Sequence, residues 1–115
     1  MHELGIASSV IDAVRAEVAA RPGQRAVVVG LRIGELAGVD PESLRFGFEC
    51  LIKDTELEPL RLEIEHVGRR QRCLDCQNNF DVDRYTLECP ACGSLRGECL
   101  SGDELDITYL EMEEA

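Results

Sequence analysis

Hydrophobic residues recur at helical spacing near the start of the chain, with polar residues on the other side of the helical wheel. The apolar positions are Leu4, Ala7, Ile11, Val14 and Val18. Spacings of three or four residues place such side chains on one face of a helix. The pattern predicts an amphipathic helix over residues 3–20, which ends before the pair Pro22-Gly23.

Three later segments have the hydrophobic patterns of strands. Residues 25–34 form a largely β-branched apolar run, which is typical of a buried strand. Residues 60–65 alternate apolar and polar side chains, as in a strand with one buried face, and residues 105–109 show the same alternation and are predicted to form the last strand. Residues 111–114, which are mostly acidic, are expected to be frayed.

A second helix is predicted between the first two strands. It begins at Pro41 and runs to about Lys53, with Leu44, Phe48 and Leu51 on one face. A strand, a helix and a strand in this order favour a parallel pair, whereas the last strand can return in either direction. The predicted fold class is therefore α/β, a small three-stranded sheet with two helices.

Four of the six cysteines form two Cys-x-x-Cys pairs between the last two strands. They are Cys73, Cys76, Cys89 and Cys92. Four thiolates at this spacing suit tetrahedral ligation of one Zn²⁺ far better than disulfides or unrelated thiols. Gly93 permits the turn after the second pair, and we expect apolar cover from Phe80, Val82, Tyr85 and Leu87. A closed shell of four protein ligands leaves no position for water, so the zinc is predicted to be structural.

The cysteine block interrupts the last two strands, so it is an insertion rather than a tail. The predicted division is residues 68–102 as a zinc-ribbon insertion and residues 1–67 with 103–115 as an α/β domain. Of the remaining cysteines, Cys50 is expected to be a buried thiol in the second helix. Cys99 is expected to be an ordinary surface or core thiol, although it lies close enough in sequence to exchange with a zinc ligand.

Charge and composition restrict the classes of partner. The formal charge is −11, with 12 Lys and Arg against 23 Asp and Glu. This balance disfavours nucleic acid and anionic membranes. The paired thiols and the absence of a secretory leader favour a reducing cytoplasm. The sequence also shows no nucleophile–base pair and no phosphate-binding glycine loop, which argues against an enzyme, and no catalytic residue is assigned.

The first three residues are a second candidate metal site. A free Met1 amine, the His2 backbone nitrogen and imidazole, and the Glu3 backbone nitrogen can form a plane of four nitrogens, which suits Ni²⁺ or Cu²⁺. Each residue also has an ordinary interpretation. His2 can be solvated and idle, Glu3 can favour the helix dipole, and Asp40 before Pro41 can cap the second helix.

The sequence resembles the HypA-type hydrogenase nickel-incorporation proteins over nearly its whole length. The resemblance rests on the opening Met-His-Glu-Leu, the segments GLRIGELAGVDPESLRFGFE and GDELDITYLE, and the pairs CLDC and CPAC. It implies a nickel metallochaperone that matures [NiFe] hydrogenases and whose partners are a GTPase accessory protein and the hydrogenase large subunit.

The resemblance also assigns residues to the two metals. It places Ni²⁺ at Met1, His2 and Glu3, with Asp40 as an outer or auxiliary ligand, and structural Zn²⁺ at the four paired cysteines. The α/β domain is then the nickel-binding domain. The alternative is a zinc-ribbon module that binds proteins or nucleic acid without nickel transfer; the net charge argues against nucleic acid.

Overall fold

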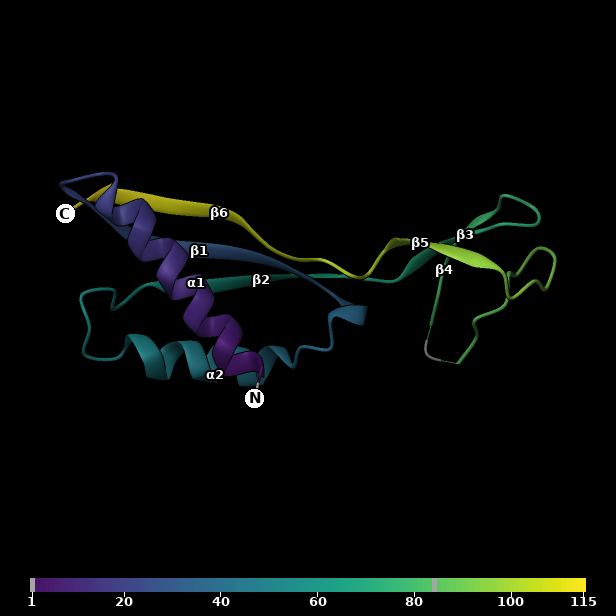
Figure 1. Ribbon diagram of the computed structural model, residues 1–115, viewed down its shortest axis with the longest axis horizontal. Helices are drawn as coiled ribbons and strands as arrows, with labels where there is room; N and C mark the ends of the chain where they lie inside the picture. Colours follow the sequence, from purple (N-terminus) through teal and green to yellow (C-terminus); the bar gives the residue numbers. More distant parts are fainter. Residues whose placement is uncertain (1, 84) are drawn as a thin grey trace. The chain divides into compact units, whose positions relative to one another are not determined.

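The structure is a computed structural model that describes residues 2–83 and 85–115. Its elements are α1 (His2–Ala19), β1 (Gln24–Gly34), η1 (Glu35–Ala37), α2 (Pro41–Ile52), β2 (Arg61–Val67), β3 (Arg70–Cys73), β4 (Asn79–Asp81), β5 (Gly97–Ser101) and β6 (Leu105–Glu114) (Figure 1). The chain divides into two compact units, each described by itself. Unit 1 comprises Met1–Arg32, Val39–Glu65 and Asp106–Ala115, and unit 2 comprises Ile33–Gly38 and His66–Leu105.

Helix α1 buries one face in the core of unit 1. Its buried residues are Ala7, Val10, Ile11 and Val14. They follow the three- and four-residue spacing expected of a single helical face. The helix ends at Ala19, and Gly23 then adopts a positive φ of 85° in the turn that leads to β1. A left-handed backbone at this point suits glycine, which has no Cβ to clash.

Strand β1 is the centre of the sheet in unit 1, whose strand order is β2-β1-β6. β2 runs parallel to β1, because Arg25 near the start of β1 lines a cavity with Arg61, whereas Arg32 near its end forms an ion pair with Glu65. β6 runs antiparallel to β1, since the Ala115 amide donates to the Gly23 carbonyl. The parallel β1–α2–β2 connection agrees with the sequence-based prediction.

Helix α2 begins with a side-chain cap. The carboxylate of Asp40 accepts a hydrogen bond from the backbone amide of Glu42, and Pro41 occupies the first turn. Both features are preferred at helix N-termini. Leu44 and Phe48 are 0% and 1% exposed, so they form the centre of the core with Val14 and β1. Burying a side chain such as Phe48 contributes about 1.5–3 kcal/mol.

Unit 2 contains a second, smaller sheet. Its order is β4-β3-β5, and both β4 and β5 are antiparallel to β3. The buried cluster here consists of Cys73, Phe80, Val82 and Cys89. Two of these four residues are cysteines of the paired motifs, so little apolar surface stabilises this unit without them. The fold class is thus the expected α/β arrangement of two helices and a three-stranded sheet, with a cysteine-rich module.

Three local predictions are wrong. Residues 111–114 are not frayed, because they belong to β6 and Glu113 forms an ion pair with Arg25 of β1. Cys50 is exposed rather than buried. In the cysteine module, Phe80 and Val82 provide the apolar cover, whereas Tyr85 and Leu87 are 86% and 50% exposed.

Candidate metal centres

The four paired cysteines converge on one point in unit 2. The sulfur atoms of Cys73, Cys76, Cys89 and Cys92 all lie within 4.8 Å of one another. The Sγ atoms of Cys73 and Cys92 are 3.6 Å apart, as are those of Cys76 and Cys89. Ligands at about 2.3 Å from a tetrahedral zinc lie about 3.8 Å from each other. The donor set and its spacing therefore fit one structural Zn²⁺.

The two cysteine pairs sit on backbone turns of the same design. In the first, the Gln77 amide donates to the Cys73 carbonyl at 2.9 Å; in the second, the Gly93 amide donates to the Cys89 carbonyl at 2.8 Å. Gln77 and Gly93 both have a positive φ, of 66° and 78°. The sequence identified Gly93 from its residue type, but nothing marked Gln77, which adopts the same left-handed conformation without being glycine.

Each turn buries one sulfur and exposes the other. Cys73 and Cys89 are 0% and 2% exposed, whereas Cys76 and Cys92 are exposed. The Nδ2 atom of Asn78 lies 3.8 Å from the Cys89 sulfur, within reach of a weak hydrogen bond. The buried pair provides the interior side of the centre, and the exposed pair closes it toward solvent.

The thiols of this cluster have pKa values displaced in opposite directions. Burial alone would raise the pKa of Cys89, but the backbone amides of Cys92 and Ala91 outweigh it and lower the pKa to about 6. The Ser94 amide lowers the pKa of Cys92, but the hydrogen bond with Cys73 and the other nearby thiols raise it to about 12. Four thiolates cannot all carry negative charge this close together unless a cation is shared among them.

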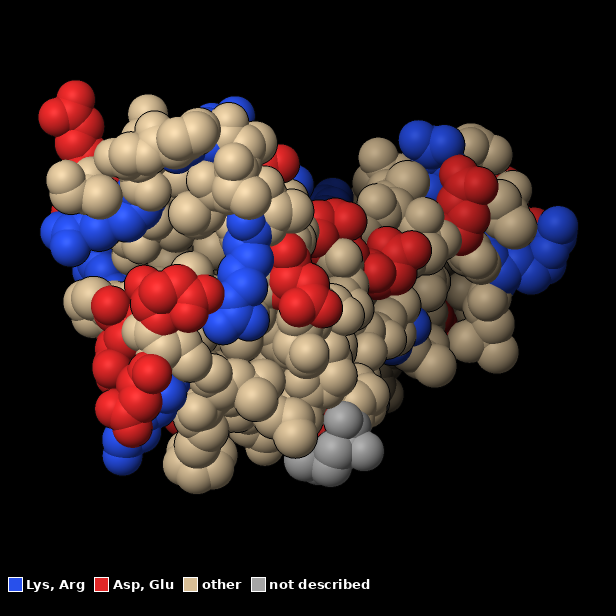
Figure 2. Space-filling view, turned by 60° about the vertical axis from the view of Figure 1, so that its left-hand side comes forward, with Lys and Arg blue, Asp and Glu red and all other residues tan. Residues whose placement is uncertain are grey.

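Charged side chains around the cluster form local pairs. Arg70 contacts Asp81, Arg72 contacts Glu98 and Arg96 contacts Asp75. These pairs are exposed, so each contributes little to stability. On the face drawn in Figure 2, the described Lys and Arg side chains are interspersed with Asp and Glu rather than joined into one basic surface.

The N-terminal candidates lie together in unit 1. His2 is the first residue of α1, and its Nε2 lies 3.3 Å from the Glu3 carboxylate. The same carboxylate oxygen accepts a hydrogen bond from the Asp40 amide at 3.2 Å. This bond lowers the pKa of Glu3, because it favours the ionised carboxylate. His2, Glu3 and Asp40 are thus neighbours, and Met1 lies outside the described residues.

The Asp40 carboxylate is already engaged in capping α2. One of its oxygens accepts from the Glu42 amide at 3.2 Å and the other from the Ser43 hydroxyl at 2.8 Å. The capping role expected from the sequence is therefore present. Three further side chains that could bind a metal, those of His66, Cys50 and Cys99, are all exposed.

The chain resembles known proteins over nearly its whole length. The profile of the family described as "Hydrogenase/urease nickel incorporation, metallochaperone, hypA" matches residues 1–112. The hydrogenase maturation factor HypA of Chlorobium luteolum is 41% identical over 99% of this chain and 97% of its own. The protein of the same name from Geotalea uraniireducens is 41% identical over 98% of this chain and 100% of its own.

Two solved structures share the fold. The solution structure of the nickel metallochaperone HypA from Helicobacter pylori has a TM-score of 0.63 at 22% identity and covers 98% of both chains. A second solution structure of a HypA protein has a TM-score of 0.72 at 23% identity and covers 98% of this chain and 97% of its own.

In the part of the chain that the structure describes, neither helix is both long and apolar enough to cross a membrane.

Proposed function

Because the chain belongs to the HypA family of hydrogenase and urease nickel-incorporation proteins, we propose that it binds Ni²⁺ at its own N-terminus and delivers it for maturation of [NiFe] hydrogenase. Members of this family are metallochaperones and maturation factors, not catalytic enzymes. The proposed ligands are the Met1 amine, the His2 backbone and imidazole nitrogens, and the Glu3 backbone nitrogen, with Asp40 as an outer or auxiliary ligand.

One observation carries this proposal, namely that His2 and Glu3 form the first turn of α1. The first amides of a helix have no intrahelical acceptor, so deprotonating them for a metal breaks no helical hydrogen bond. The side chain of His2 is 61% exposed, so its imidazole can reach an ion from solvent. Four nitrogens in one plane suit Ni²⁺.

The exposure of this site also suits a carrier, which must release its ion. A shallow site at a chain end loses the ion more readily than a closed thiolate shell does. Binding requires a neutral imidazole and deprotonated backbone nitrogens, so falling pH weakens nickel affinity. The four-cysteine centre has the opposite character, since four protein ligands close its shell, and we assign it Zn²⁺ as a structural ion.

The partners proposed for this function are a GTPase accessory protein and the hydrogenase large subunit. Membership of a family of hydrogenase maturation factors supports partners in that pathway. A cytoplasmic location and the division into a nickel-binding domain, 1–67 with 103–115, and a zinc-ribbon insertion, 68–102, stay predictions. The charge of −11 argues against a nucleic-acid or membrane partner.

The test is calorimetric titration of Ni²⁺ into the zinc-loaded protein. Substitution His2→Gln removes the imidazole but keeps a bulky second residue, which spares Met1 from processing, and we expect nickel affinity to fall by at least about tenfold. His66→Gln is the matched control, since His66 is the other histidine and is also exposed.

A second variant tests the chain end itself. One glycine added before Met1 moves the amine out of the chelate, so nickel affinity falls while zinc content stays at one ion per chain. If both variants bind nickel as the unmodified protein does, the N-terminal site is wrong. The alternative, a zinc-ribbon interaction module without nickel transfer, then becomes the better interpretation.

A further inference from the structure

The sheet of unit 1 has two edge strands, β2 and β6, because its order is β2-β1-β6. One side of an edge strand presents backbone N–H and C=O groups that no strand of the sheet pairs. Proteins usually protect such edges with lysine, proline or covering side chains. The two edges of this sheet differ in how they are protected.

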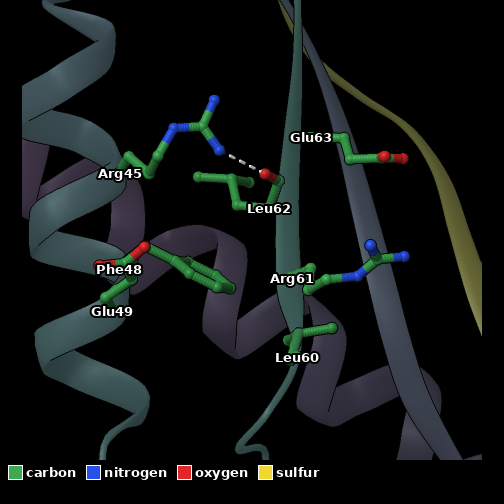
Figure 3. Close-up of a pocket in the computed structure, with 7 residues that line it drawn as sticks. All are labelled: Arg45, Phe48, Glu49, Leu60, Arg61, Leu62 and Glu63. Carbon is green, nitrogen blue, oxygen red and sulfur yellow. Dashed lines mark hydrogen bonds between the residues drawn. The ribbon is translucent and has the colours of Figure 1, made fainter.

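The β2 edge is closed by helix α2. The Arg45 side chain donates a hydrogen bond from Nη1 to the Leu62 carbonyl at 2.6 Å (Figure 3). Leu62 points toward α2, whereas Glu63 points away from the helix (Figure 3). An added strand at β2 would have to displace the Arg45 side chain from its acceptor.

In the described part of the chain, no side chain of another element forms a hydrogen bond to the backbone of the β6 edge, which we define as Asp106–Glu114. It contains no lysine, arginine or proline. A cavity of about 280 Å³ is lined by four consecutive residues of this strand, 107–110, together with Met112, Glu17 and Arg21. Successive side chains of a strand point to opposite faces. A cavity lined by consecutive residues therefore runs along the edge and does not lie on a single face.

Strand β6 carries partly exposed apolar side chains on the face of the sheet opposite α2. Ile107 and Tyr109 are 45% and 43% exposed. The Tyr109 hydroxyl donates to Glu63, which points away from α2, and this places the ring on the open face. Added strands gain affinity from main-chain hydrogen bonds and specificity from alternate side chains. Ile107 provides an apolar contact for such a strand, whereas the Tyr109 ring extends inward over Gly30 of β1 toward Glu63 of β2.

The charge of the edge selects between occupants. Among the described residues, Asp106, Glu111 and Glu114 form no ion pair, whereas Glu113 pairs with Arg25, and Arg21 pairs with Glu17. Pairing with the β6 edge of a second copy would place these carboxylates near others of the same sign, which is destabilising. Each copy also carries a charge of −11. A basic segment has the complementary charge.

We propose that the β6 edge binds an extended segment of another protein in which basic and apolar side chains alternate, and that this segment adds a fourth strand to the sheet. The proposal does not depend on nickel binding at the N-terminus. It identifies a docking site on unit 1 that remains available whatever metal the chain carries.

The probe is an octapeptide in which lysine and valine alternate, blocked at both ends and added to the zinc-loaded protein at low salt. Amide hydrogen exchange, resolved by NMR, should slow at least about tenfold at saturating peptide for those amides of residues 106–114 that face the open edge, and stay unchanged in β2. A peptide of the same composition, with four lysines followed by four valines, should bind far more weakly. Added salt should lower the affinity for the alternating peptide, because salt screens the attraction between opposite charges.

Two charge reversals distinguish peptide binding at the β6 edge from attraction of the peptide to the overall negative charge of the protein. Glu111→Lys should lower the affinity for the alternating peptide about threefold to tenfold, because it places on the edge a charge of the same sign as the peptide's. Glu65→Lys makes the same change of charge on β2 and should alter affinity by less than about twofold. If circular dichroism or zinc content shows that Glu111→Lys is misfolded, the milder pair Asp106→Asn and Glu111→Gln replaces it.

Several outcomes overturn the proposal. The proposal is wrong if amide exchange does not slow at about 1 mM peptide, or if it slows at β2 rather than at β6. It is also wrong if the protein binds the two peptides with equal affinity, or if the two charge reversals change peptide affinity equally. Protection of residues 106–114 that rises with protein concentration alone would identify a second copy as the occupant and would also overturn it.

Discussion

The carboxylate of Glu3 accepts a hydrogen bond from the backbone amide of Asp40, with 3.2 Å between oxygen and nitrogen. The bond joins the first turn of α1 to the residue that caps α2. The same oxygen lies 3.3 Å from the His2 imidazole. The Glu3 carboxylate thus contacts both the imidazole proposed as a nickel ligand and the backbone of Asp40, the residue proposed as an auxiliary ligand.

Removing this carboxylate should weaken nickel binding without affecting zinc. For Glu3→Ala we expect a loss of nickel affinity of about tenfold, since groups that orient metal ligands typically contribute that much. Glu3→Gln keeps an acceptor oxygen for the Asp40 amide and should lose less. Calorimetry measures both affinities, and Glu17→Ala, in the same helix, is the control. Equal affinity in Glu3→Ala and the unmodified protein would show that the carboxylate positions nothing.

Removing zinc should unfold unit 2 while unit 1 stays folded. The buried cluster of unit 2 has four residues, and two of them are Cys73 and Cys89. A core this small does not fold without its metal, which contributes on the order of 10 kcal/mol. Cys89→Ser should therefore lose zinc, and amides in β3 and β5 should lose protection from hydrogen exchange.

The control for this prediction is Cys99→Ser, because Cys99 is exposed and is not part of the four-sulfur cluster. It should retain one zinc and full protection. Amides in α1 and α2 should remain protected in both variants. Protection of β3 and β5 that survives in zinc-free Cys89→Ser would mean that apolar packing alone holds this unit.

Local patterns in the sequence predicted the two helices, the three strands of the sheet in unit 1 and the convergence of the four paired cysteines. The Cys-x-x-Cys pairs specify their own turns, and Asp40-Pro41 specifies a helix start, because both depend on residues within a few positions. Helix periodicity placed Leu44 and Phe48 in the core correctly. Such features need no knowledge of distant segments.

The errors had two sources, contacts between distant segments and inference from residue type alone. The acidic residues at the end of β6 were judged by local charge, but Glu113 meets Arg25 across the sheet. Cys50 was judged by residue type, although its helical position lies away from the face that holds Leu44 and Phe48. The contact between Glu3 and Asp40 was likewise not predicted, because 37 positions separate them.

Tyr109 should ionise at higher pH than an ordinary tyrosine. Its hydroxyl donates to Glu63, and this bond, together with burial, raises the pKa of Tyr109 above the usual value near 10. In Tyr85→Phe, absorbance at high pH reports Tyr109 alone, since the chain has two tyrosines. Adding Glu63→Gln to this variant should lower the pH at the midpoint of the Tyr109 titration. A titration midpoint at or below pH 10 in Tyr85→Phe alone would contradict the hydrogen bond.

The raised pKa of Tyr109 also fixes the sign of its effect on stability. Neutral Tyr109 is favoured in the native state, so this contribution is fully present below about pH 10 and is lost as the pH rises through the native pKa. The difference in unfolding free energy between the unmodified protein and Tyr109→Phe should therefore be constant near neutral pH and shrink in alkaline solution. A difference that grows with pH would have the wrong sign.

Gly34 should tolerate no side chain. A Cβ at this position would lie 2.1 Å from the backbone carbonyl carbon of Gly102, and backbone atoms cannot move aside as a flexible side chain can. The Leu36 amide also donates to the Gly102 carbonyl at 2.6 Å, which fixes this approach. Gly34→Ala should lower the free energy of unfolding by about 3 kcal/mol, the upper range for overpacking. Gly68→Ala is the matched control, because a Cβ there meets nothing within 4 Å. Denaturant unfolding of zinc-loaded protein measures both, and equal stability of the two variants would show that Gly34 and Gly102 do not approach this closely in solution.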